Sequence, residues 1–271
     1  MSKDERDKPV TKKHAQLLSL VKQEFPRLGD FLTTAAENRT INLATHMGDA
    51  VNKRFPGSYL RGLAELFEYL DVVFAAFQRE PLLTSIAFLI SRARSDFEVA
   101  FEAILSGLNS VVLDSMRDVM EVEYLLREFS HDLSLIAVWL NSDSSARTSK
   151  FSPARLRQRQ AKRLGKAPRN VLEKFEYKIH SESLHVVPPS ELNDHASKGF
   201  SKAPRIEGLE FGFWEIFEHA YRLVLELHRL GGKVSGSVWT APDPMAELPN
   251  LQDSHKRMAT VIMLFAKNHR I

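Results

Sequence analysis

The chain has 271 residues, of which 44% are hydrophobic and 26% are charged, with a formal net charge of +3 and no cysteine. This composition is typical of a globular protein and excludes a largely disordered, collagen-like or mucin-like chain. The absence of cysteine also excludes a disulfide framework, a thiolate metal site and a cysteine nucleophile.

Helical spacing dominates the sequence from residue 57 onward. Apolar residues recur at steps of three and four, which places them on one face of a helix. We expect a first helix after Ser58 and a second that begins at Pro81 and ends near Gly107. The expected inward positions are Leu60, Leu63, Phe67, Leu70, Phe74 and Phe77 in the first, and Ile86, Ile90, Ala93, Phe97, Ala100 and Ile104 in the second.

The longest apolar pattern runs from Leu108 to Leu140 and predicts a single helix of roughly 50 Å. A seam of this length needs antiparallel neighbours, which the two preceding helices can provide. The sequence therefore predicts an all-α protein, a helical bundle built around three long amphipathic helices over about residues 57–140. The expected inward positions of the third helix are Leu108, Val112, Ser115, Val119, Val122, Leu126, Phe129, Leu133, Ile136 and Leu140.

Further helices are expected to pack around this core. One begins at Pro153 and is short and basic, and another covers about residues 170–187. A later helix ends at Gly231-Gly232, and a last one is capped by Asp253 or Ser254. The expected inward positions of the later helix are Phe213, Phe217, Ala220, Val224 and Leu227. We divide the chain into an N-terminal helical region (1–56), a core bundle (57–187) with a basic segment (147–178), and C-terminal helices and loops of the same domain (188–271).

Charge is distributed unevenly along the chain. Residues 60–140 hold six Arg and no Lys against thirteen Asp and Glu, a local charge of −7, whereas residues 147–178 hold eleven Lys and Arg against two Glu, a local charge of +9. Such a segment can bind RNA or DNA phosphates, an acidic protein partner, or the acidic half of its own bundle. The candidate nucleic-acid-binding residues, which have no interleaved aromatic residue to stack on bases, are Arg155, Arg157, Arg159, Lys162, Arg163, Lys166 and Arg169.

Two groups of polar residues form a candidate cluster. Arg117 and Glu121 are an i,i+4 pair on the long helix, and Tyr177, Ser181 and His185 lie on one face of the helix that ends before Pro188. These side chains could bind a phosphate or move a proton. They could equally be a solvated face or a structural network between helices.

The Arg-x3-Glu motif of Arg117 and Glu121, followed by the Tyr-x3-Ser-x3-His helix, resembles a large family of bacterial all-helical proteins that carry a domain of unknown function. That family is considered beside abortive-infection proteins and the HEPN (higher eukaryotes and prokaryotes nucleotide-binding) ribonucleases. The resemblance covers about residues 94–189. It implies a prokaryotic, all-helical protein with a role in defence or stress, in which these polar residues gather between the helices.

HEPN ribonucleases use an Arg followed, after four to six residues, by a His. The Arg positions a phosphate while the imidazole assists attack by the ribose 2′-hydroxyl. Arg222-x5-His228 and Arg39-x6-His46 fit this spacing, although 21 Arg and 10 His give about two such matches by chance. The resemblance makes Arg222 and His228 the candidate catalytic residues of a metal-independent ribonuclease, and it implies a homodimer because such sites usually form across one.

A metal centre is a further alternative. Glu128-x2-His131 and Glu182-x2-His185 match the Glu-x-x-His motif of di-iron helical bundles, and Glu98 stands thirty residues before the first pair. No independent helix supplies the remaining Glu ligands, so no metal ligand or cofactor is assigned. The sequence leaves three hypotheses open. They are an RNA-binding protein or ribonuclease, a non-catalytic protein–protein interaction module, and a ferritin-like di-iron carboxylate protein.

The sequence gives no indication of export or membrane insertion. The first residues alternate acid and base with no apolar stretch behind them, and the most apolar run is Leu82–Ile90. A membrane span requires about 20 apolar residues. We therefore expect a cytoplasmic protein that does not bind a membrane.

Overall fold

The computed structural model describes residues 59–163 and 206–268 and, closer to the N-terminus, residues 16, 19–27, 32–37 and 39–41. All regular structure in these residues is helical, and they contain no strand. The all-α prediction is thereby confirmed. The helix expected over about residues 170–187 lies outside the described residues.

Helix α3 (Tyr59–Phe77) is followed by the short helix α4 (Pro81–Thr84) and by helix α5 (Phe88–Ser106). The helix predicted to begin at Pro81 is therefore divided in two. Gly107 ends α5 with a φ of +77°, as a C-terminal glycine is expected to do.

The six inward positions predicted for residues 86–104 are all buried. The prediction for α3 is less accurate. Phe67 and Phe74 are only partly buried at the edge of the core, whereas Leu66 and Val73 lie at its centre.

Helix α6 (Asn109–His131) ends earlier than predicted, and helix α7 (Ser134–Leu140) follows it as a separate element. The prediction of one continuous helix to Leu140 is therefore wrong. Asp132 between them has extended backbone, and its carboxylate accepts hydrogen bonds from the amide and hydroxyl of Ser134. The apolar pattern nevertheless continues across the break, since Phe129 and Ile136 are fully buried, although Leu140 is 39% exposed.

A side chain from a distant helix satisfies the end of α6. The Lys233 ammonium donates to the carbonyl oxygens of Ser130 and His131 at 2.6 and 2.9 Å. The last carbonyls of a helix have no partner within it, and a cation stabilises them both by hydrogen bonding and through the helix dipole. This contact explains why α6 can end where the apolar spacing alone predicts continuation.

Two short helices, α8 (Ser144–Phe151) and α9 (Pro153–Arg163), follow α7. Helix α9 begins at the predicted proline. Helix α8 is not among the predicted helices, because Phe151 is its one buried residue and it carries no apolar stripe. Its start is fixed locally by Asp143, whose carboxylate accepts a hydrogen bond from the Ala146 amide at 2.7 Å.

Helix α12 (Ile206–Ser235) carries the predicted inward residues on one face, each at most 1% exposed: Phe213, Phe217, Ala220, Val224 and Leu227. The predicted end at Gly231-Gly232 is wrong, because the helix continues to Ser235 before the 3₁₀ turn η1 (Gly236–Val238). Gly231 has a packing role instead. A Cβ atom at this position would lie 2.2 Å from the indole of Trp239, so the ring rests directly on the helix backbone.

The C-terminal part holds helix α13 (Pro244–Glu247) and helix α14 (Pro249–Asn268). Helix α14 begins four residues before the predicted cap at Asp253, and Ser254 is fully buried within it. Its N-terminus is capped by Glu65 of α3, whose carboxylate accepts hydrogen bonds from the Leu251 amide at 2.9 Å and from the Asn250 side chain. A carboxylate at this end also complements the helix dipole.

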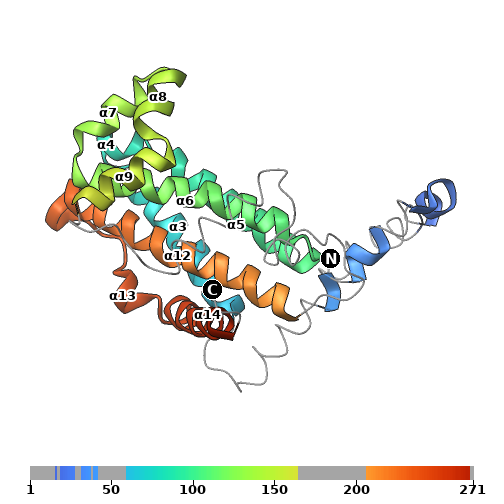
Figure 1. Ribbon diagram of the computed structural model, residues 1–271. Helices are drawn as coiled ribbons and strands as arrows, with labels where there is room; N and C mark the ends of the chain where they lie inside the picture. The colour runs from blue at the N-terminus through green and yellow to red at the C-terminus, as the bar shows by residue number, and fades with distance from the viewer. Residues whose placement is uncertain are drawn as a thin grey trace, which may run out of the picture.

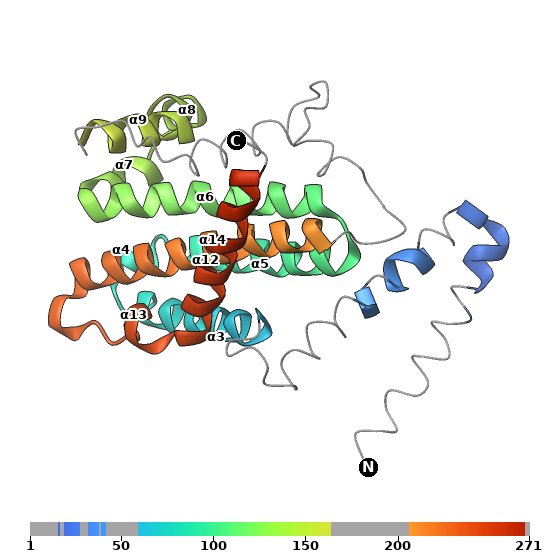
Figure 2. The ribbon, with the colours of Figure 1, turned by 60° about the horizontal axis from the view of Figure 1, so that its bottom comes forward.

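The long helices form a bundle (Figures 1 and 2). Helix α6 packs against α5 and α12, and α14 lies across α12 and α3. Tyr69 of α3 is buried and donates a hydrogen bond to the carbonyl of Val224 in α12. The helices α7, α8 and α9 gather at one end of this bundle, where α9 contacts α6.

None of the described helices combines the length and the apolar character that crossing a lipid bilayer requires.

The adjacent glycines of α12 provide a matched test of this packing. We expect Gly231→Ala to lower the free energy of unfolding by about 1–3 kcal/mol, because the new methyl group would collide with Trp239. Gly232→Ala should instead raise it by up to about 1 kcal/mol, because nothing lies within 4 Å of its Cβ position and alanine favours a helix. Urea denaturation of both variants measures the difference. Equal shifts would mean that Trp239 does not rest on Gly231.

Candidate nucleic-acid interface

Helix α9 is attached to the bundle through the carboxylate of Glu128. This side chain comes from α6 and is fully buried. Arg159 donates to it through Nε at 2.9 Å, and Arg163 donates to both of its oxygens. Burial alone would raise the pKa of Glu128, but the hydrogen bonds from Arg163 and Arg159 lower it below its ordinary value. The carboxylate therefore stays ionised and holds two positive charges of the basic segment.

A second polar group strengthens the same contact. Gln160 of α9 is 6% exposed, accepts a hydrogen bond from Arg127 of α6 at 3.2 Å and donates one to the carbonyl of Tyr124. Arg127 in turn donates to Glu226 of α12 at 2.8 Å. Together with the buried Leu156, these contacts fix which face of α9 is turned toward the bundle.

The structure divides the seven predicted basic residues into groups. Arg159 and Arg163 dock on the acidic bundle through Glu128. This contact agrees with one of the three predicted partners of the basic segment, the acidic half of its own bundle. Arg155 and Lys162 are exposed on α9, and Arg157 is partly buried. Lys166 and Arg169 lie outside the described residues. Self-docking therefore accounts for part of the basic segment and leaves other cations at the surface.

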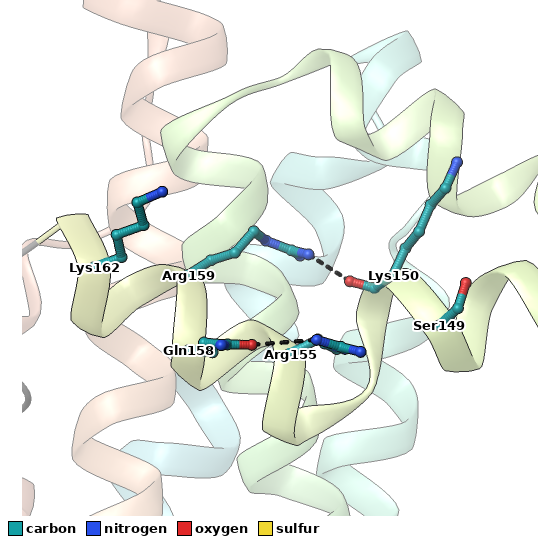
Figure 3. Close-up of a pocket in the computed structure, with 6 residues that line it drawn as sticks. All are labelled: Ser149, Lys150, Arg155, Gln158, Arg159 and Lys162. Carbon is teal, nitrogen blue, oxygen red and sulfur yellow. Dashed lines mark hydrogen bonds between the residues drawn. The ribbon is translucent and has the colours of Figure 1, made fainter.

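A surface hollow of about 400 Å³ lies between α8 and α9 (Figure 3). Four of its six lining residues are cationic, and none of the six is acidic. Lys150, which the sequence analysis did not single out, contributes the cation on α8. The lining residues are Ser149, Lys150, Arg155, Gln158, Arg159 and Lys162.

The cations of the hollow differ in how they are held. Arg159 donates to the carbonyl of Lys150 through Nη1 at 2.5 Å in addition to its bond with Glu128, so it joins the two helices (Figure 3). Arg155 contacts the amide oxygen of Gln158 at 3.4 Å. The ammonium groups of Lys150 and Lys162 form no salt bridge with any described residue. The hollow thus offers net positive charge to a ligand.

The candidate polar cluster is only partly described. Arg117 and Glu121 form the expected i,i+4 pair at 3.6 Å, with about two fifths of each side chain exposed. Burial raises the pKa of Glu121, Arg117 opposes this shift, and Asp118 adds to it. Tyr177, Ser181 and His185 lie outside the described residues. Whether the five side chains meet therefore stays a prediction.

The candidate catalytic residues have separate partners in the structure. The Arg222 guanidinium pairs with Glu218 at 2.5 Å, one turn earlier on α12. The His228 ring instead accepts a hydrogen bond from the indole nitrogen of Trp239 at 3.2 Å. Six residues at about 100° each place the two side chains about 120° apart around α12. Catalysis by this pair stays a prediction.

A buried polar group that the sequence analysis missed joins α6 to α12. The Nδ1 atom of His219 lies 2.7 Å from the carboxylate of Glu123, and its Nε2 atom lies 3.6 Å from that of Glu215. All three side chains are at most 1% exposed. The sequence does contain a signal for this group, because Glu215 and His219 are an i,i+4 pair on the apolar face of the helix. Ionisable side chains on a buried face are expected to pair with each other.

The structure does not support the di-iron alternative at the residues it describes. Both oxygens of Glu128 are held by arginines, His131 is exposed, and Glu98 pairs with Arg94 at the surface. Within the described part of the chain, no three His, Cys, Asp or Glu residues are arranged to hold a metal ion.

The attachment of α9 can be tested at Glu128. We expect Glu128→Gln to lower the free energy of unfolding by about 1–3 kcal/mol, because it removes a buried charge-assisted partner from two arginines that remain partly solvated. Trypsin should also cut within α9 faster. Glu98→Gln is the matched control, since its exposed pair with Arg94 is worth about 0–1 kcal/mol. Equal effects of the two variants would contradict the anchoring role.

A pH dependence follows from Glu218, which is 14% exposed. Burial alone would raise its pKa, but a hydrogen bond from His255 and the charge of Arg222 lower it from 4.5 to about 2. A depressed native pKa gives stability that is present above pH 4.5 and is lost as the pH falls toward 2.

We therefore expect the wild-type protein to lose about 3 kcal/mol through Glu218 over this pH range. Glu218→Gln should be less stable near pH 6, and the two stability curves should converge near pH 2. Urea denaturation at a series of pH values measures this. Parallel curves would show that Glu218 is not stabilised in its ionised form.

Comparison with known proteins identifies no relative of this chain. No protein-family model matches it, and neither a curated protein nor a solved structure does so. These comparisons therefore assign no function to the chain.

Proposed function

We propose that this protein binds RNA through the hollow between α8 and α9. The observation that carries the proposal is the lining of that hollow, in which four cationic side chains come together without an acidic one. Phosphate groups are the natural ligands of such a surface, because affinity for a nucleic acid depends on the number of phosphates that cations neutralise. The loose resemblance to the HEPN-associated family is the reason for choosing RNA among the polyanions.

The charge distribution supports this placement of the ligand. Residues 60–140, which form most of the bundle, carry a local charge of −7 and repel a polyanion, whereas the α8–α9 surface attracts it. Glu128 compensates part of the positive charge from beneath, but it is fully buried behind Arg159 and Arg163. The cations that face solvent in the hollow can thus anchor a polyanion.

Binding is favoured over cleavage in this proposal. Arg222 is paired with Glu218, and His228 accepts a hydrogen bond from Trp239, so each member of the ribonuclease pair already has another partner. We therefore propose a binding protein, with the defence- or stress-related role in a prokaryotic cell that the resemblance implies. Cleavage by this pair would require Arg222 and His228 to exchange these partners for the substrate.

The test compares two lysines on different helices. We expect Lys162→Glu to weaken RNA binding by about tenfold at low salt, because it reverses one charge of the hollow. Lys256→Glu is the matched control. It makes the same change in net charge at an exposed position of α14, which packs on α12 and α3. Fluorescence anisotropy with a labelled single-stranded RNA measures both affinities.

Two outcomes would contradict the proposal. Equal weakening by the two variants would mean that RNA responds only to overall charge. Absence of RNA binding, combined with salt-sensitive capture of an acidic peptide that depends on Lys162, would favour the protein-interaction alternative for the same surface.

A further inference from the structure

We infer that the hollow binds the phosphates of a nucleic acid and distinguishes neither its bases nor its sugars. This inference rests on the proposed function and specifies the class of ligand for the same site. It is carried by the chemistry of the six lining side chains and by the positions of the groups around them.

The cations of α9 form a row that suits a chain of phosphates. Arg155, Arg159 and Lys162 are separated by four and three residues, which places them on one face of the helix with axial spacings of about 6 and 4.5 Å. Lys150 forms the opposite wall on α8 (Figure 3). Three cations in a row on α9, with Lys150 opposite them, can contact successive phosphates of one strand. This arrangement suits a polyphosphate chain better than a single small anion.

The groups that could read a base are already engaged. Gln158 is the one amide in the lining, and its oxygen accepts from Arg155 at 3.4 Å, so it does not present a free bidentate edge to adenine. The guanidinium of Arg159 is held by Glu128 and by the carbonyl of Lys150. The Ser149 hydroxyl donates to the carbonyl of Ala146.

No aromatic platform is present among the lining residues of the hollow. The adjacent Phe151 is 7% exposed, and the guanidinium of Arg159 lies 5.6 Å from its ring centroid. Its ring is therefore covered and does not offer a face on which a base could stack. A protein gains sequence preference on a single strand by stacking bases and by hydrogen bonding to their edges. The lining offers neither an aromatic ring for the first nor a free amide for the second.

The inference predicts a specific salt dependence. Arg155, Lys150 and Lys162 can each neutralise a phosphate, whereas the charge of Arg159 is partly compensated by Glu128. Three phosphate contacts give a slope of about −2 for the logarithm of affinity against the logarithm of salt concentration on a single strand. Lys162→Ala should reduce this slope by about 0.7, since it removes one contact.

The experiment measures the affinity of the full-length protein for labelled oligo(U), oligo(A), a mixed-sequence RNA and a mixed-sequence DNA of equal length, with and without inorganic polyphosphate as competitor. We expect the four affinities to agree to within less than about tenfold, which is the discrimination that one good base contact provides. Polyphosphate should displace all four oligonucleotides.

The outcomes separate this inference from the proposed function. A preference above about tenfold for one sequence or for RNA over DNA, or a failure of polyphosphate to compete, overturns recognition by phosphates alone while RNA binding stands. Absence of binding to every oligonucleotide overturns both. Lys162→Ala with an unchanged salt slope would place the binding site elsewhere on the protein, and Lys256→Ala provides the control for overall charge.

Discussion

The buried carboxylate of Glu128 is the constraint on which the arrangement of the basic segment depends. An ionised carboxylate inside a protein is costly unless hydrogen-bonded cations compensate it. Arg159 and Arg163 provide that compensation, and they do so from one face of α9. Satisfying Glu128 therefore fixes the rotation of α9 on α6. The same rotation leaves Arg155 and Lys162 at the surface, where they line the hollow with Lys150.

Long-range polar contacts perform a similar role at other points of the bundle. Lys233 of α12 satisfies the last carbonyls of α6, and Glu65 of α3 satisfies the first amides of α14. In each case the end of one helix is defined by a side chain of another, so the helices fix one another's lengths as well as their packing. The buried contact of Glu123 with His219 adds a polar link between α6 and α12 at the centre of the bundle. Apolar burial holds the bundle together, and these polar contacts specify how it is arranged.

The proposed site consists largely of cations of the basic segment that do not pair with the bundle. A basic segment beside an acidic bundle could have folded back on it completely, and Arg159 and Arg163 show that folding back does occur. The bundle offers one buried carboxylate to α9 at this position, however, and the segment has more cations than Glu128 can pair. Three cations that Glu128 does not pair line the hollow between α8 and α9. Their side chains suit phosphate groups and make few specific contacts available to bases.

The sequence by itself determined the helical architecture, because apolar residues at steps of three and four need no information about distant residues to identify one face of a helix. It determined the inward faces of α5 and α12 correctly, and it located the basic segment. The tertiary structure decided where α6 and α14 end or begin, since Lys233 and Glu65 lie more than 100 residues from the termini they cap. It also decided that Gly231 packs against Trp239, that Arg222 and His228 have different partners, and which cations of α9 face solvent. The ends of α6 and α14 and the exposure of the α9 cations depend on contacts between segments far apart in the chain, and a local pattern of residues carries no record of such contacts. Trp239 is close in sequence to Gly231 and His228, but it reaches both only because the chain turns after α12, and helical spacing does not predict that turn.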